Sequence, residues 1–146
     1  MRAEALVDLS AIKHNVALLK EKSGRDVLAV VKADAYGHGL IPVAKAALDA
    51  GASMLGVALL EEAISLREAG ITAPILAWLL QPGSDFKLAI ENDIDIAAGS
   101  LAALTEIQAA SGEKRARVHL ELDTGMTRGG FLSCLLYTSP SPRDCS

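Results

Sequence analysis

The chain has 146 residues, a formal net charge of −4, and a composition that is 51% hydrophobic but only 3% aromatic. This length is enough for one domain with a buried core. The negative charge argues against nucleic acid or an anionic membrane as a partner. No apolar run is long enough to cross a bilayer and the first residues lack a signal-peptide pattern, so we expect a cytoplasmic protein. Cys134 and Cys145 have no metal-ligand or disulfide-framework spacing.

Strands and helices are predicted to alternate along the chain. A strand over 3–9 precedes a helix that Ser10 caps and Gly24 ends. The later strands are predicted over 27–32, 54–58, 74–78, 94–98 and 117–122. The helices between them are predicted over 43–50, 59–69, 85–92 and 101–110. Ser84 and Asp85 can cap the third of these helices, and Ser100 caps the last.

This alternation predicts a parallel α/β fold. Two closures of the sheet are possible, an open doubly wound sheet or a (β/α)₈ barrel. In either closure, functional residues lie at the carboxyl ends of the strands. That rule places Lys32, and the segments that follow Ala58, Trp78 and Leu122, on one face of the sheet.

The stretch around Lys32 is the first candidate for chemistry. The apolar residues 27–31 lead directly into Lys32, and Tyr36 and two glycines around His38 follow. This pattern is typical of a buried strand, so Lys32 stands where the strand leaves the core. A lysine at the mouth of an apolar barrel loses its proton more easily than one in water and can bind a carbonyl compound covalently. The alternative is a lysine that extends into solvent.

The second candidate is a strand that ends in a glycine-rich turn, over 119–130. Arg128 in this turn presents a planar set of donors that suits a carboxylate or a phenolic oxygen; the alternative is a loop arginine in solvent. Asp123 is expected to hold the turn. Glu121 alternates with two leucines and therefore faces away from them. If that face is buried, the carboxylate needs a partner, for which Arg128 is the expected residue.

Three other residues are expected to be structural. His38 holds its loop through a hydrogen bond, because a flexible loop orients a base poorly. His119 is expected to pack on its strand. Trp78 stands where a strand ends, and core packing is favoured for it over the alternative of lining the barrel mouth. The glycines at 37 and 39 match no established phosphate-binding motif.

Three stretches resemble bacterial alanine racemases. Residues 29–39, which contain Lys32, are similar to the family's pyridoxal-phosphate attachment motif. Residues 122–128, which end at Arg128, resemble its second signature, and residues 7–15 resemble its N-terminus. The order and spacing of the three also agree. The chain is therefore identified as a member of this family from about residue 3 to about residue 130.

The resemblance implies a (β/α)₈ TIM barrel that binds pyridoxal 5′-phosphate, followed by a β-domain, in a homodimer. It implies a cytoplasmic isomerase that interconverts L-alanine and D-alanine and supplies D-alanine for the cell wall. Lys32 would carry the cofactor and act as one of two bases, the other being a tyrosine of the partner subunit. Tyr36 would contact the cofactor phosphate, and Arg128 would contact the phenolic oxygen and the substrate carboxylate. No metal, nucleic acid or membrane partner is expected.

Two features depart from the family pattern. At the position of Glu121, many members have a lysine that carries a carbamate, and we expect the Glu121 carboxylate to supply the same negative charge directly. Residues 1–131 are expected to be the N-terminal part of the barrel, with about five of its eight strands. Residues 132–146 are serine- and proline-rich and resemble a non-native tail. The chain alone is expected to be inactive.

Two other functions remain open at this point. One is a non-catalytic pyridoxal-phosphate-binding protein of the same barrel superfamily, against which the 34–39 stretch and the Arg128 turn argue. The other is a related enzyme with another substrate, such as a serine racemase or a decarboxylase. The second signature favours racemisation over decarboxylation, but it does not choose alanine over serine.

Overall fold

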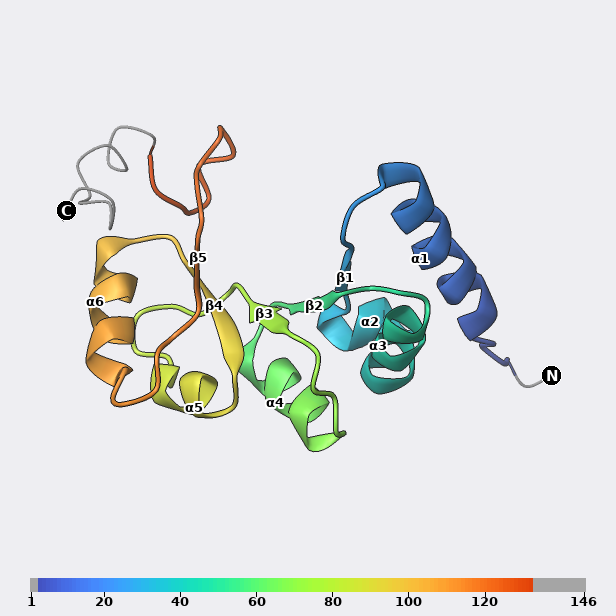
Figure 1. Cartoon of the computed structure of the whole chain (residues 1–146), viewed down its shortest axis with the longest axis horizontal. Helices are drawn as coiled ribbons and strands as arrows, with labels where there is room; N and C mark the ends of the chain where they lie inside the picture. The colour runs from blue at the N-terminus through green and yellow to red at the C-terminus, as the bar shows by residue number, and fades with distance from the viewer. Residues whose placement is uncertain (1–2, 133–146) are drawn as a thin grey trace.

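The computed structural model describes residues 3–132, which form a five-stranded parallel sheet with helices (Figure 1). The strands are β1 (Leu28–Val30), β2 (Met54–Val57), β3 (Ile75–Ala77), β4 (Ile94–Ala98) and β5 (Val118–Leu120). The helices are α1 (Leu9–Ser23), α3 (Leu40–Asp49), α4 (Leu60–Glu68), α5 (Phe86–Glu91) and α6 (Leu101–Ala110). The element α2 (Lys32–Gly37) is a single turn with unusual geometry.

The order of the strands decides between the two closures. The strands pair in sequence order, β1-β2-β3-β4-β5, and every pair is parallel. Figure 1 shows α4, α5 and α6 together along one side of the sheet. A doubly wound sheet reverses its strand order and carries helices on both faces, whereas a (β/α)₈ barrel does neither. The chain is therefore an α/β fold with five strands of an incomplete TIM barrel.

The two faces of the sheet differ in burial. The side chains that point toward the helices form the core, and the largest of them on the sheet are fully buried: Leu55, Val57, Ile75, Ile94 and Ile96. On the inner, barrel face, Val30 is 42% exposed. Trp78 packs on this inner face against Gly56, where a Cβ atom would lie 2.6 Å from the Trp78 ring. Trp78 is half-buried and lies outside the core cluster, so the core packing expected for it is wrong; its ring lines the barrel mouth instead.

Local sequence signals explain where several helices begin and end. The Ser100 side chain accepts a hydrogen bond from the N–H of Ala103 at the start of α6. Asp85 caps α5 in the same way through Leu88, and Gly24 ends α1 with a left-handed φ of 60°. A side-chain oxygen that pairs a free N–H, and a glycine that tolerates positive φ, are the usual ends of a helix. These predictions are confirmed.

The prediction for the N-terminus is wrong. Residues 3–8 form no strand, and α1 begins at Leu9. The cap is Asp8 rather than Ser10, because the Asp8 carboxylate accepts the N–H groups of Ser10 and Ala11 at 2.9 and 3.2 Å. Helix α1 has no buried residue and is tied to α3 by an ion pair between Lys13 and Asp49. Apolar alternation alone does not make a strand when no neighbouring strand pairs with it.

Two further expectations concern the C-terminal tail and the absence of a membrane span. The tail predicted over 132–146 lies, apart from Leu132, outside the described residues. Among residues 3–132, no helix combines the length and apolarity needed to cross a membrane.

Candidate active site

A cavity of about 650 Å³ lies at the carboxyl ends of the strands. Lys32 enters it from the end of β1, and Glu121 and Arg128 enter it after β5. The remaining wall comes from the ends of β2, β3 and β4, including Ala58, Trp78, Gln81, Gly99 and Ser100. The structure therefore brings together three of the four residues singled out in the sequence. The fourth, Tyr36, is 61% exposed, and its ring centre lies 5.8 Å from Lys32 Nζ.

The backbone directly after Lys32 forms a left-handed turn. Four consecutive residues, 33–36, have φ between 52° and 56° and ψ between 39° and 51°. None of them is glycine, and for such residues this conformation costs about 1–2 kcal/mol each. A strained backbone of this kind persists only where the surroundings fix it, and it is most frequent at functional sites.

Hydrogen bonds at both ends hold this turn. The N–H of Ala35 donates to the carbonyl oxygen of Val31 at 2.8 Å, and that of Gly39 donates to the carbonyl oxygen of Asp34 at 2.9 Å. The Asp34 carboxylate accepts the N–H of Leu40, which starts α3, at 2.6 Å. The ring Nδ1 of His38 donates to the carbonyl oxygen of Ala35 at 2.9 Å. His38 thus has the loop-holding role expected from the sequence.

Glu62 makes a further connection that sequence reasoning missed. Its carboxylate accepts the N–H of Ala33 at 2.5 Å, and those of Ala58 and Leu59 at 2.9 and 3.0 Å. The only sequence signal is that Glu62 stands three residues after the N-cap Leu59, as the glutamate of a capping box does, although leucine lacks the side-chain oxygen of that motif. That signal does not predict the contact with Ala33, which lies 29 residues earlier in the chain.

The segment with Arg128 is a tight glycine-rich loop over 123–130. The Asp123 carboxylate accepts the N–H groups of Gly125 and Thr127, each at 2.9 Å, and these bonds lower the pKa of Asp123 from its ordinary value. Gly130 has a φ of 101°, and a Cβ atom there would lie 2.7 Å from the Asp123 nitrogen. The structural role expected for Asp123 is confirmed.

The partner expected for Glu121 is not found. Within residues 3–132, Glu121 and Arg128 line the same cavity but form no ion pair within 4.0 Å. The expectation assumed a buried carboxylate, whereas Glu121 is exposed in this open part of the barrel. A solvated carboxylate needs no charged partner. Two cationic groups and one carboxylate therefore face the cavity with room for a ligand.

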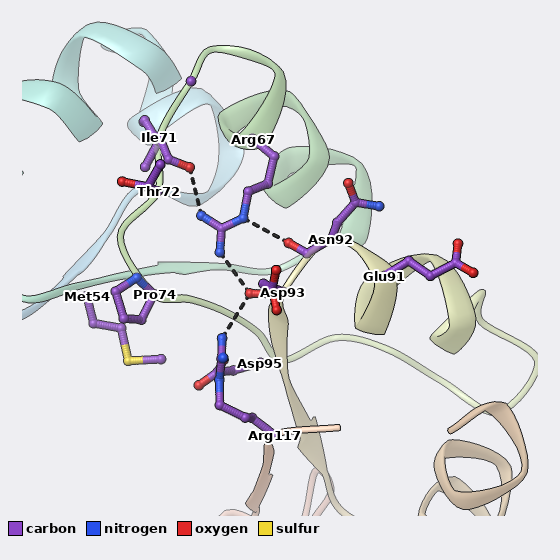
Figure 2. Close-up of a pocket in the computed structure, with 11 residues that line it drawn as sticks. Met54, Arg67, Ile71, Thr72, Pro74, Glu91, Asn92, Asp93, Asp95 and Arg117 are labelled. Atoms are coloured by element: carbon purple, nitrogen blue, oxygen red, sulfur yellow. Dashed lines mark hydrogen bonds and ion pairs between the residues drawn. The ribbon is translucent and has the colours of Figure 1, made fainter. Parts of the chain in front are cut away.

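A second cavity lies at the amino-terminal edge of the sheet, and the ionic side chains that line it are held by ion pairs or hydrogen bonds (Figure 2). The Arg67 guanidinium points into the space between strand ends and donates to four carbonyl oxygens, those of Ile71, Ala73, Asn92 and Asp93, at 2.7–2.9 Å. Arg117 pairs with Asp95 at 2.6 Å. His119 also contacts the Asp95 carboxylate, at 3.0 Å. His119 thus takes part in a polar cluster instead of the simple packing expected.

Comparison with known proteins agrees with the sequence motifs. Residues 7–135 match the family model described as alanine racemase, N-terminal domain. An alanine racemase of Mycolicibacterium smegmatis is 53% identical over 131 residues, which are 88% of this chain and 34% of the relative.

Solved structures show the same relationship. The crystal structure of an alanine racemase from Streptomyces lavendulae matches with a TM-score of 0.86 and 44% identity, over 90% of this chain and 35% of that one. A histidine racemase from Leuconostoc mesenteroides matches with a TM-score of 0.78 and 35% identity, over 86% and 34% of the two chains. The chain thus spans about a third of the length of these relatives.

Proposed function

Because the chain belongs to the family of alanine racemase N-terminal domains, we propose that it is the cofactor-binding part of a pyridoxal-phosphate-dependent alanine racemase. The longer protein interconverts L-alanine and D-alanine and works in the cytoplasm to supply D-alanine for the cell wall. Residues 1–131 form the first part of its barrel, and the tail over 132–146, whose first four residues still fall within the family match, is proposed to be non-native. One observation carries the proposal: Lys32 and Arg128, from opposite ends of the sheet, line one cavity.

The residues of this cavity fit the proposed cofactor. Pyridoxal phosphate has an aldehyde, a phenolic oxygen and a phosphate. Lys32 supplies a primary amine for the aldehyde, and Arg128 supplies a guanidinium for an oxygen anion. Both side chains lie in the cavity, whose volume of about 650 Å³ is in the usual range for sites that bind small molecules.

Each residue then has a role in the reaction. Bound pyridoxal phosphate accepts electron density and makes the α-proton of an amino acid acidic. Lys32 would hold the cofactor through Nζ, and its amine would move the α-proton on one face of the substrate. Arg128 would bind the phenolic oxygen and the substrate carboxylate, and Tyr36 would donate its hydroxyl to the phosphate. Glu121 supplies negative charge near Arg128.

Inversion of the α-carbon needs a second proton-transferring group on the opposite face. We assign it to a tyrosine of the partner subunit in a homodimer of the longer protein. Lys32 alone can remove and return a proton on only one face, which would restore the original configuration. The chain by itself is therefore expected to bind the cofactor without racemising alanine.

The test is capture of the cofactor by Lys32. Pyridoxal phosphate added to the purified chain should give the yellow absorbance of a lysine-bound cofactor, and Lys32→Ala should abolish it. Lys45→Ala is the matched control, because Lys45 is an exposed lysine of the neighbouring helix α3. Equal absorbance from the wild type and Lys32→Ala would remove Lys32 from the site.

Activity is tested in a chimera, in which residues 1–131 replace the matching segment of the Mycolicibacterium smegmatis relative. It should racemise alanine, and it should lose this activity with Lys32→Ala. No activity in a folded chimera that binds the cofactor would contradict the assignment.

A racemase for another amino acid is the second candidate. The likeness to a histidine racemase supports it, because the same barrel segment there belongs to an enzyme whose named substrate has a larger side chain. The same chimera, assayed with L-alanine, L-serine and L-histidine, distinguishes the two. The first proposal requires the highest kcat/KM with alanine.

A further inference from the structure

We propose that Glu62 is a positioning residue, whose carboxylate holds the left-handed turn after Lys32 and thereby sets where the Lys32 amine lies in the cavity. The inference rests on the proposed function, since that function gives the amine a cofactor to bind. It adds a residue outside the cavity lining that acts through the backbone.

The contacts of Glu62 join the ends of two strands. Oε1 accepts the N–H of Ala33, the residue directly after Lys32, and Oε2 accepts the N–H groups of Ala58 and Leu59. Ala58 follows β2 and lines the cavity. One carboxylate therefore fixes the exit of β1 relative to the exit of β2, next to the site.

A cap for α4 alone does not explain these contacts. A capping-box glutamate serves the backbone N–H of the cap residue, here Leu59, and one oxygen suffices for that. The second oxygen of Glu62 leaves the helix and takes the N–H of Ala33 instead. The side chain thus accepts a hydrogen bond from the segment after Lys32, a contact that helix capping does not require.

The turn depends on this bond at its first residue. Ala33 is the first of the four left-handed residues. Ala35, two residues on, has a backbone acceptor in Val31, whereas Glu62 is the acceptor of the Ala33 N–H. Without it, the exposed Ala33 N–H is left to water, and the strained backbone that carries Lys32 is free to rotate toward the right-handed region.

Glutamate is the residue type that these three donors require. Both carboxylate oxygens accept, whereas glutamine offers one accepting oxygen and one donating NH₂ group. In Glu62→Gln the oxygen satisfies the two donors of Ala58 and Leu59, and the NH₂ group then faces the Ala33 N–H. The substitution keeps the size and the helix cap and selectively removes the bond beside Lys32.

The experiment compares Glu62→Gln with the wild-type chain and with Glu61→Gln. Glu61 is the adjacent, exposed acidic residue of the same helical turn. Hydrogen exchange of the Ala33 amide, measured by NMR, reports the turn. Absorbance titration with pyridoxal phosphate reports cofactor capture, and thermal unfolding reports the whole fold.

In Glu62→Gln we expect the Ala33 amide to exchange about tenfold faster or more, the effect of losing a hydrogen bond to a charged acceptor. Cofactor affinity should fall by a similar factor, and the lysine-bound absorbance band should shift. Glu61→Gln should match the wild type in all three measurements. A purely structural role would lower the unfolding temperature and leave the absorbance band of the bound cofactor unchanged, which would overturn the proposal.

Two failures can be told apart. If the wild-type chain captures the cofactor and Glu62→Gln captures it equally well with the same band, only the positioning role of Glu62 is refuted. If the wild type and Lys32→Ala both fail to capture it, the proposed function is refuted and the positioning role with it.

Discussion

The two edges of the sheet use charged residues in opposite ways. At the amino-terminal edge, Arg67 donates to four carbonyl oxygens, Arg117 pairs with Asp95, and Lys114 pairs with Asp93. At the carboxyl edge, Lys32, Glu121 and Arg128 form no ion pair within residues 3–132.

The carboxyl edge is also marked by unusual backbone geometry. Four non-glycine residues beside Lys32 have left-handed geometry, and the loop that carries Arg128 closes against backbone atoms at Gly130. In barrels of this kind, the amino-terminal edge serves stability and the carboxyl edge binds ligands. Among residues 3–132, the charges at the amino-terminal edge are paired and those beside the strained turn at the carboxyl edge form no ion pair, which agrees with that division of roles.

The largest effect is expected at the amino-terminal edge, from Arg67→Met. It removes four hydrogen bonds, although the Asp93 carbonyl oxygen keeps a second donor in Arg117. At about 1 kcal/mol for each hydrogen bond, the free energy of unfolding should fall by about 3–4 kcal/mol. Urea denaturation followed by circular dichroism measures this. Arg25→Met is the control, because the Arg25 side chain lies exposed in the loop after α1. A change below about 0.5 kcal/mol would show that this edge does not carry the stability.

The next effect is expected in the Arg128 loop, from Gly130→Ala. Its φ of 101° and the Cβ contact with the Asp123 nitrogen at 2.7 Å leave no room for a side chain. We expect a loss of about 2–3 kcal/mol and weaker cofactor capture, since Arg128 moves with the loop. Gly112→Ala, which meets no atom within 4 Å, should change neither. Unaltered cofactor capture by a folded Gly130→Ala variant would separate this loop from the site.

A smaller effect of opposite sign is expected from Ala33→Gly. Glycine has no penalty at a φ of 53°, so this substitution should stabilise the chain by about 0.5–1 kcal/mol. At Ala17, which is exposed in the middle of α1, the same substitution should destabilise it by about 1 kcal/mol. The sign difference, read from urea denaturation, tests the left-handed turn, and equal losses at both positions would contradict it.

The smallest effect concerns Asp123 and pH. Hydrogen bonds from Gly125 and Thr127 hold the pKa of Asp123 below its ordinary value of 3.8. Because this pKa is lower in the folded chain than in the unfolded one, the bonds stabilise the loop fully above about pH 3.8, and the stabilisation is lost as the pH falls through the lower, folded value. NMR titration of the Gly125 and Thr127 amides should give a midpoint below 3.8, and Asp123→Asn should remove the transition. A midpoint at or above 3.8 would mean that the carboxylate does not hold this loop.

Regular elements with strong local signals could be predicted from the sequence. Strand β4 and helix α6 have the predicted bounds, because an apolar run and the Ser100 cap mark them directly. The predicted strand over 3–9 failed because apolar alternation does not provide a pairing partner. The left-handed turn could not be predicted, since Ala33, Ala35 and Tyr36 lack the side chains that usually mark positive φ.

Part of the candidate site was predictable, because the carboxyl ends of parallel strands lie on one face of the fold. That rule and the motifs placed Lys32 and Arg128 together, and the structure places both in one cavity. The absence of a Glu121–Arg128 ion pair follows from exposure, which sequence alternation does not give. Glu62 contacts Ala33, 29 residues away, and Arg67 contacts Asn92 and Asp93, 25 and 26 residues away, so no local sequence pattern predicts these contacts.

The most direct test of the carboxyl edge is to find where pyridoxal phosphate attaches. The purified chain is treated with the cofactor and then with borohydride, which fixes the lysine-bound cofactor irreversibly, and the labelled peptides are mapped by mass spectrometry. We predict that the label lies on Lys32, with Lys45 and the other exposed lysines unlabelled at equimolar cofactor. Label spread over the surface lysines, or absent from Lys32, would contradict the assignment of this edge as the cofactor site.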